Sequence, residues 1–219
     1  MPCLSFENGK ASDEEVLVSR LIEKAVRRSN ALDLESLCIV AGEKVWNIRA
    51  DINFIADDGG LIDASCLGVM TALQHFRKPD ISIRGTEVII HSTETHQPTP
   101  LSILHIPLCT TYSFFNPLGD AENIKGDSTS EIAILDADKA EELLRDGSLV
   151  FTMNMNRELI QISKNGGLPI DGRVLLELAR DGLSSIDKLT KLMKDALNKN
   201  FETRYRSEGL QLLEVGAKR

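Results

Sequence analysis

The first residues that suggest chemistry are three cations near the start of the chain. Arg20, Lys24 and Arg27 follow one another at intervals of about one helical turn, with Arg28 beside them. Guanidinium and ammonium groups at this spacing can contact successive backbone phosphates of a nucleic acid, whatever its base sequence. A charged helix face is also commonly just a solvated surface. Both interpretations remain open from the spacing alone.

A second candidate is the turn Asp57-Asp58-Gly59-Gly60, which separates an alternating segment from an apolar one. A glycine-rich turn before a helix can bind a phosphate through its exposed amides. The next residues, however, are Leu61, Ile62 and Asp63. The turn therefore lacks the Lys-Ser/Thr of a P-loop and the three glycines of a dinucleotide fingerprint. An acidic, apolar flank is a poor anion site, so a plain tight turn is favoured.

Four carboxylates form a third group: Asp136, Asp138, Glu141 and Glu142. Carboxylates at the end of a strand and in the following helical turn can bind Mg²⁺. Acidic residues in the first turn of a helix are also what the helix dipole favours. From the sequence, helix capping is the preferred interpretation, and the metal site is the alternative.

Other catalytic or metal-binding signatures are absent from the sequence. There is no Gly-x-Ser-x-Gly, and the four histidines lack the spacing of known zinc motifs. The four cysteines form no Cys-x-x-Cys pair, which predicts buried, reduced thiols of an intracellular protein: Cys3, Cys38, Cys66 and Cys109. We therefore expect no nucleophilic catalysis, no metal and no cofactor.

The composition narrows the class of protein. The chain has 219 residues, of which 42% are hydrophobic and 26% charged, and a formal charge of −8. These values exclude a mainly disordered chain and disfavour a polycation that coats nucleic acid or anionic membrane. Aromatic residues make up only 5%, so a stacking platform for single-stranded bases is not expected. No apolar run reaches the roughly 18 residues that a membrane span needs.

Periodicity places these candidates on an α+β framework of two subdomains. A capping box at Ser12 and Glu15 predicts a helix that buries Val18, Leu21, Ile22 and Ala25 and exposes the cations. Strict alternation predicts a half-buried strand over Val45–Ala56, and an apolar run predicts a helix buried between layers over Leu61–Phe76. Further strands are expected at 36–40, 81–83 and 88–91.

The second half begins after the polar loop 92–100, whose two prolines mark the best internal boundary. The remaining elements expected are strands at 101–106, 108–115 and 132–135, a polar loop at 116–130, a helix at 137–145, a hairpin at 149–154 and 158–163, and a helix from 171 to about 206. The last dozen residues are expected to be a frayed tail.

Long stretches of this sequence resemble the RNase PH-type ring subunits of the eukaryotic RNA exosome, in the fungal form. The resemblance rests on residues 31–81, which include CIVAGEKVWNIRADINFIADDGG, and on 100–117, 130–158 and 162–167. It implies the RNase PH fold, a duplicated β-α-β-α arrangement related to domain 2 of ribosomal protein S5. The implied domains are the C-terminal portion of RNase PH domain 1 at 1–97, domain 2 with its long helix at 98–207, and a tail at 208–219.

The resemblance also implies partners and a role. Six such subunits form a hetero-hexameric ring through which RNA threads, with cap proteins on one face and a hydrolytic nuclease on the other. The implied tasks are 3′-end processing and degradation of ribosomal, small and messenger RNA in nucleus, nucleolus and cytoplasm. No membrane is involved. Arg20 and Lys24 match channel-facing cations of non-catalytic members, and Arg27 extends that face by spacing.

Catalytic members hold phosphate with Gly-Gly-Thr-Arg and with an Arg ahead of the first helix, and hold a metal with two aspartates. Here Gly59 and Gly60 match, but Leu61 and Ile62 replace Thr and Arg. Lys10 stands in place of the leading Arg. The two aspartate positions carry Asp136 and Glu142. The resemblance therefore implies a chain with no catalytic residues and no bound metal.

Strands that normally precede the equivalent of Phe6 have no counterpart here, so we expect an incomplete first sheet with an unpaired edge and a chain that is not stable alone. The favoured function is a non-catalytic ring component that lines the RNA path through Arg20, Lys24 and Arg27. The alternatives are an active phosphate-dependent 3′-exoribonuclease, and an assembly protein that never contacts RNA.

Overall fold

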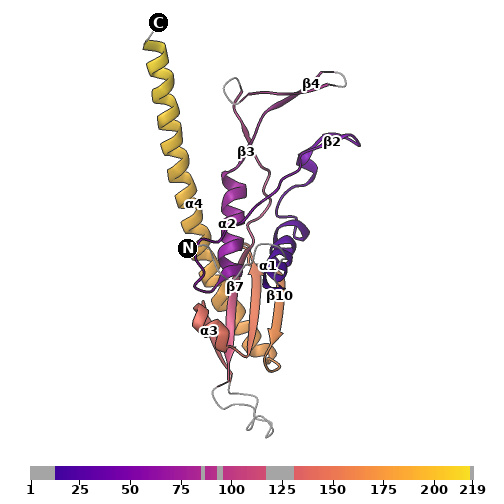
Figure 1. Cartoon of the computed structure of the whole chain (residues 1–219), viewed down its shortest axis with the longest axis vertical. Coiled ribbons are helices and arrows are strands. Elements are labelled where there is room, and N and C mark those ends of the chain that lie inside the picture. The colour runs from indigo at the N-terminus through magenta and orange to yellow at the C-terminus, as the bar shows by residue number, and fades with distance from the viewer. Residues whose placement is uncertain (1–12, 85–86, 93–95, 117–130, 218–219) are drawn as a thin grey trace.

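The computed structural model describes residues 13–84, 87–92, 96–116 and 131–217, and side chains as far as Arg204 (Figure 1). In chain order the elements of the first half are α1 (Asp13–Glu23), the π-helical η1 (Lys24–Arg28), η2 (Glu35–Leu37), β1 (Cys38–Val40), β2 (Lys44–Val45), α2 (Leu61–His75), β3 (Arg77–Lys78), β4 (Ile81–Arg84), β5 (Glu87–Ile90) and β6 (Thr99–Pro100). Those of the second half are β7 (Leu108–Phe115), β8 (Ile132–Leu135), α3 (Lys139–Leu144), β9 (Gly147–Met153), β10 (Leu159–Gly166) and α4 (Gly172–Ala217).

A four-stranded antiparallel sheet with the order β10-β9-β7-β8 forms the centre of the described structure. In the β7–β9 register Thr111 lies opposite Val150, and in the β7–β8 register Ser113 lies opposite Ile134. Almost every residue of β7 and β9 is buried, which indicates that these strands are covered on both faces. The strand and hairpin predictions at 108–115, 132–135, 149–154 and 158–163 are confirmed.

Helices cover the sheet on both sides, and alternate residues of β7 face each layer. Toward α2, the amide and hydroxyl of Thr111 donate hydrogen bonds of 2.8 and 2.7 Å to the Asp63 carboxylate. Toward α4, the Tyr112 hydroxyl donates to the Leu178 carbonyl at 3.0 Å. The core between the layers is apolar and includes Met70, Leu73, Leu108, Phe151 and Ile186.

The first helix follows its predicted amphipathic pattern. Val18, Leu21, Ile22 and Ala25 are buried, and the basic residues on the other side are exposed. Ser12, the expected capping residue, lies outside the described residues. The regular helix ends at Glu23 and continues as η1, after which Asn30 adopts a positive φ of 56° that ends the helical winding.

The predicted strand over Val45–Ala56 is wrong: only Val45 belongs to a strand, and 46–56 is irregular. A strand is held by hydrogen bonds to a neighbour, and no described strand pairs with this segment. The predicted alternation of buried and exposed side chains is partly present: Trp46, Ile48 and Phe54 are half-buried, and Asn47 and Arg49 are exposed. Within the described residues, 46–56 therefore has no strand beside it.

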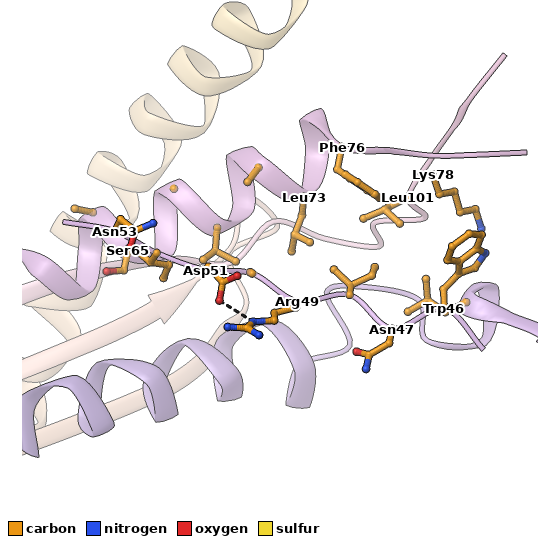
Figure 2. Close-up of a pocket in the computed structure, with 18 of the residues that line it drawn as sticks. Trp46, Asn47, Arg49, Asp51, Asn53, Ser65, Leu73, Phe76, Lys78 and Leu101 are labelled. Atoms are coloured by element: carbon orange, nitrogen blue, oxygen red, sulfur yellow. Dashed lines mark hydrogen bonds and ion pairs between the residues drawn. The ribbon is translucent and has the colours of Figure 1, made fainter. Parts of the chain in front are cut away.

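Two grooves flank this segment, one of about 750 Å³ against α2 and one of about 1020 Å³ against α1. Figure 2 shows the first: Trp46, Leu73, Phe76 and Leu101 border the space. The face of α2 that carries Ala64, Gly68 and Ala72 is exposed here. The prediction that α2 is buried between two layers thus holds for its sheet side only.

Three further predictions differ from the structure. Residues 101–106 form no strand. The stretch makes one isolated bridge, Leu32 to Ile103, because its pairing with residues 31–33 extends over too few residues to form a ladder. The chain from 208 to 217 is helical, as part of α4, because Leu, Gln and Glu favour helix. Cys38 is exposed at the start of an uncovered hairpin, while Cys66 and Cys109 are buried.

The contact between Asp63 and Thr111 has an electrostatic cost. Burial of the carboxylate raises the pKa of Asp63 from 3.8 to about 6, against the effect of the two Thr111 hydrogen bonds. The neighbouring charges of Asp136 and Glu142 raise this pKa further. Because the folded protein keeps a proton that the unfolded chain releases, this carboxyl stabilises the fold most at low pH. That contribution is lost as the pH rises through about 6.

Asp63→Asn should remove this titration. The free energy of unfolding of the wild type minus that of the variant is expected to fall by on the order of 2–3 kcal/mol as the pH rises from 4 to 7. Urea unfolding at a series of pH values measures this difference, with Asp195→Asn, an exposed aspartate of α4, as the control. A difference for Asp63→Asn that does not change with pH would contradict the assignment.

Candidate functional site

The turn Asp57–Gly60 leads directly into α2, and both of its glycines have positive φ, 92° at Gly59 and 64° at Gly60. The backbone comes so close to the start of α3 that a Cβ on Gly59 would lie 2.5 Å from the Ala137 carbonyl oxygen. Glycine is therefore required at Gly59 by packing as well as by conformation. This observation supports the tight-turn interpretation of the motif.

An ion pair and a backbone hydrogen bond fasten the turn to α3. The Lys139 ammonium lies 2.9 Å from the Asp57 carboxylate, which is almost fully buried. The Lys139 amide donates to the Asp58 carbonyl at 3.1 Å. The pKa of Lys139 is raised, chiefly by its hydrogen bond to Asp57. The cation at the start of α3 is thus already paired with a carboxylate of the turn itself.

A second carboxylate occupies the start of α2. The Gly60 amide donates a hydrogen bond of 3.2 Å to the Glu142 carboxylate, which comes from α3, 82 residues further along the chain. The same oxygen lies 3.3 Å from the Arg145 guanidinium. Free amides at a helix N-terminus attract anions, and here the chain supplies the anion from its own side chain. A phosphate at this position would have to displace Glu142.

Of the remaining acidic residues, two cap α3 and one lies beside the glycine turn. Asp138 and Glu141 form a capping box at the start of α3, with hydrogen bonds of 2.9 and 3.0 Å in the two directions. The capping interpretation is confirmed for this pair. Asp136 has a positive φ of 59° and points toward the turn, so that a Cβ on Gly60 would lie 3.4 Å from its carboxylate.

These carboxylates do not assemble into a metal site within the described residues. No three of them bring ligand atoms within 4.8 Å of one another. The charge around the turn is instead predominantly negative, with Asp57, Asp63, Asp136 and Glu142 against two cations, Lys139 and Arg145. Such a site disfavours an anionic ligand.

Ile62 is a packing residue. Ile62 is half-buried and contacts both hydrophobic clusters of the core, so its side chain points into the fold. Neither Leu61 nor Ile62 can donate a hydrogen bond from its side chain. Lys10, the residue in place of the leading Arg, lies outside the described residues.

The basic residues lie on the opposite side of the first helix from its core contacts. Arg20 is in α1 and Lys24 and Arg27 are in η1, and all three side chains are exposed. Arg27 forms an ion pair of 3.6 Å with Glu23, one turn earlier. Within the described part of the chain Arg20 and Lys24 form no ion pair. These two side chains are therefore the more available cations of the predicted stripe.

Sequence reasoning missed the contact between Glu142 and Gly60, because nothing local relates positions 82 residues apart. It also missed the role of Asp63, although a single acid in an apolar helix is a visible signal. A third omission is a cluster of Asp80, His91 and His96, whose ligand atoms lie within 4.8 Å of one another. The histidine spacing matches no zinc motif, so only the folded hairpin brings these residues together.

Comparisons with known proteins agree with this geometry. A family model described as the 3′ exoribonuclease family, domain 1, matches residues 3–79, and the model of domain 2 of the same family matches residues 105–180. The chain is 54% identical over 200 residues to the Exosome complex component RRP45 of Saccharomyces cerevisiae, which covers 91% of the chain and 66% of the relative. It is 46% identical over 204 residues to the Schizosaccharomyces pombe protein of that name, covering 92% and 66% respectively.

The human Exosome complex component RRP45 is 36% identical over 204 residues, which is 93% of this chain and 44% of that protein. The chain therefore spans about two thirds of the length of its fungal relatives and less than half of the human one.

Two solved structures share the fold. The Archaeoglobus fulgidus exosome with RNA bound to the active site superposes with a TM-score of 0.67 at 24% identity, over 87% of this chain and 65% of that one. An archaeal exosome core superposes with a TM-score of 0.64 at 25% identity, over 85% and 66%. Since both domain models match in order and the α+β architecture agrees, the chain belongs to the 3′ exoribonuclease, or RNase PH, family.

Proposed function

We propose that this chain is a non-catalytic ring component of an RNA exosome, which guides RNA without cutting it. The observation that carries the proposal is the hydrogen bond from the Gly60 amide to Glu142. In this family the glycine turn is where a phosphorolytic member would bind phosphate. Here a carboxylate of the chain lies on the helix start, and Ile62 packs into the core.

The electrostatics argue against phosphorolysis. A phosphate would have to enter beside Asp63, Asp136 and Glu142 and displace the last of them from Gly60. The lost contact to a guanidinium at position 62 alone costs on the order of 1.5–3 kcal/mol. No side chain described here offers a substitute, because Lys139 is paired with Asp57 and Arg145 with Glu142. An active phosphate-dependent 3′-exoribonuclease therefore stays the alternative, without a specific observation in its favour.

RNA contact is proposed for the exposed basic stripe of Arg20, Lys24 and Arg27. The chain as a whole carries −8, so a local positive face is needed for any approach of RNA. The stripe supplies such a face on a helix that is anchored through its buried side. Contacts to backbone phosphates are independent of sequence, as a general RNA path requires.

Assembly with other chains is supported by a segment that has no strand partner within the described residues. The segment 46–56 lies between two grooves without a strand partner. We propose that the partners are other RNase PH-like subunits in a hetero-hexameric ring, cap proteins and a hydrolytic nuclease, in line with the names of the relatives. The proposed setting is intracellular, in nucleus, nucleolus and cytoplasm.

The absence of phosphorolysis can be tested directly. Purified chain, alone and in the assembled ring, is expected to release no nucleoside diphosphates from oligo-RNA and orthophosphate, because Glu142 accepts the hydrogen bond of the Gly60 amide and Ile62 offers no phosphate ligand. Thin-layer chromatography of labelled products measures this, with an active family member as the positive control. Phosphate-dependent product that disappears in a Gly60→Val variant of the same ring would establish the enzyme alternative.

Charge reversal tests the basic stripe. The double variant Arg20→Glu/Lys24→Glu should weaken RNA binding by the ring and lower the slope of log affinity against log salt by roughly 1.4, about 0.7 for each lost phosphate contact. The control is Lys188→Glu/Lys191→Glu, which makes the same charge change at exposed positions of α4. Unchanged RNA binding in an intact ring would favour the assembly protein that never contacts RNA.

A further inference from the structure

We propose that Asp80, His91 and His96 form a binding site for a divalent transition metal of the Zn²⁺ class. These are the residues of the described chain whose carboxylate and imidazole ligand atoms gather within 4.8 Å of one another. The site lies at the base of the β4–β5 hairpin, which Figure 1 shows projecting away from the central sheet. It is separate from the glycine turn and from the basic stripe, and the proposed function does not depend on it.

The hairpin register explains how the first two ligands meet. Ile81 lies opposite Ile90 in the β4–β5 pair, so Asp80 and His91 face each other one position beyond it. The His91 amide donates to the Asp80 carbonyl at 2.9 Å, which extends the pairing to these two residues. The ladder therefore fixes the backbone under two of the three ligands.

The third ligand, His96, is tied to the end of the hairpin by its backbone. The His96 amide donates to the Ser92 carbonyl at 3.1 Å. The His96 Nδ1 lies 3.2 Å from the Asp80 carboxylate, and its ring stacks on that of His91 at a centroid distance of 3.9 Å. A carboxylate and two imidazoles thus converge from three points of the chain.

The donor set suits zinc and similar ions. Imidazole nitrogen and carboxylate oxygen are common zinc ligands, and three protein ligands leave a fourth position for water or for a group from another molecule. His91 Nε2 is already bonded to the Ser82 hydroxyl at 2.9 Å, so its Nδ1 is the nitrogen left for a metal. A hydrogen bond to the non-ligating nitrogen is the usual device that orients a metal-binding histidine.

Binding requires a small side-chain adjustment. The ligand atoms of a tetrahedral zinc ion lie roughly 3.3 Å from one another. The ligand atoms of Asp80, His91 and His96 lie within 4.8 Å of one another. The side chains of Asp80 and His96 are 40% and 48% exposed, so the His96 ring can turn toward solvent, at the cost of its stacking on His91. The ion would then replace the direct contact between Asp80 and His96.

A bound ion would stabilise an element that has little packing of its own. Two-stranded ribbons are marginal in water, and Ile83 and Ile90 of this hairpin are more than half exposed. Metal binding to Asp80 and His91 would join the two strands at the base of the ribbon and attach His96 to them. The predicted consequence is a hairpin whose backbone amides exchange more slowly with zinc than without it.

Zinc titration of the full chain tests the proposal. Exposed thiols also bind zinc, so the background is Cys3→Ser/Cys38→Ser; Cys38 is exposed and Cys3 lies outside the described residues. Calorimetry should show one equivalent bound in the micromolar range. The ring nitrogen resonances of His91 and His96 should move, and those of His75 and His105 should not.

Variants separate a metal site from an ion pair alone. His91→Gln, His96→Gln and Asp80→Asn should each abolish stoichiometric binding, and Ser82→Ala should weaken it on the order of 10-fold. His75→Gln, an exposed histidine bonded to Asn200, is the matched control and should bind as the background does. Circular dichroism confirms that each variant is folded. No binding by the background chain, or undiminished binding by His91→Gln/His96→Gln, overturns the proposal.

Discussion

The described structure depends on the burial of β7 on both of its faces. Thr111 fixes α2 to one face through the Asp63 carboxylate, and Tyr112 fixes α4 to the other through the Leu178 carbonyl. The neighbouring strands β8 and β9 then place α3 beside the start of α2. The contact of Glu142 with Gly60 agrees with this arrangement, and the ion pair of Lys139 with Asp57 holds the same two parts of the chain together.

That contact affects whether the glycine turn can bind an anion. Exposed amides at the start of a helix form an anion site when they are free. Here the Glu142 carboxylate of α3 accepts a hydrogen bond from the Gly60 amide. The surrounding acids raise the pKa of Asp63 further, which is a local sign of the same negative potential. The proposed function therefore uses this fold as a scaffold and assigns the contact with RNA to the exposed basic residues of the first helix.

Away from β7 the elements have fewer partners. Segment 46–56 lies between two grooves, and the β4–β5 hairpin exposes aliphatic side chains on a two-stranded ribbon. Both are held by few contacts within the described residues. We propose another chain as the partner of the first element and a metal ion as the ligand of the second.

Short-range periodicity predicted the amphipathic first helix, the helix over Leu61–Phe76, the strands around β7 and the α+β class, because a single element can express such a pattern. The sequence also indicated the absence of a phosphate-binding side chain at Ile62. The strand predicted over Val45–Ala56 failed for a different reason, since a strand needs a neighbour that local pattern does not supply. Two features needed the folded chain: the hydrogen bond from Gly60 to Glu142, and the cluster of Asp80, His91 and His96. Such contacts depend on distance in space, which the spacing of residues along the chain does not give.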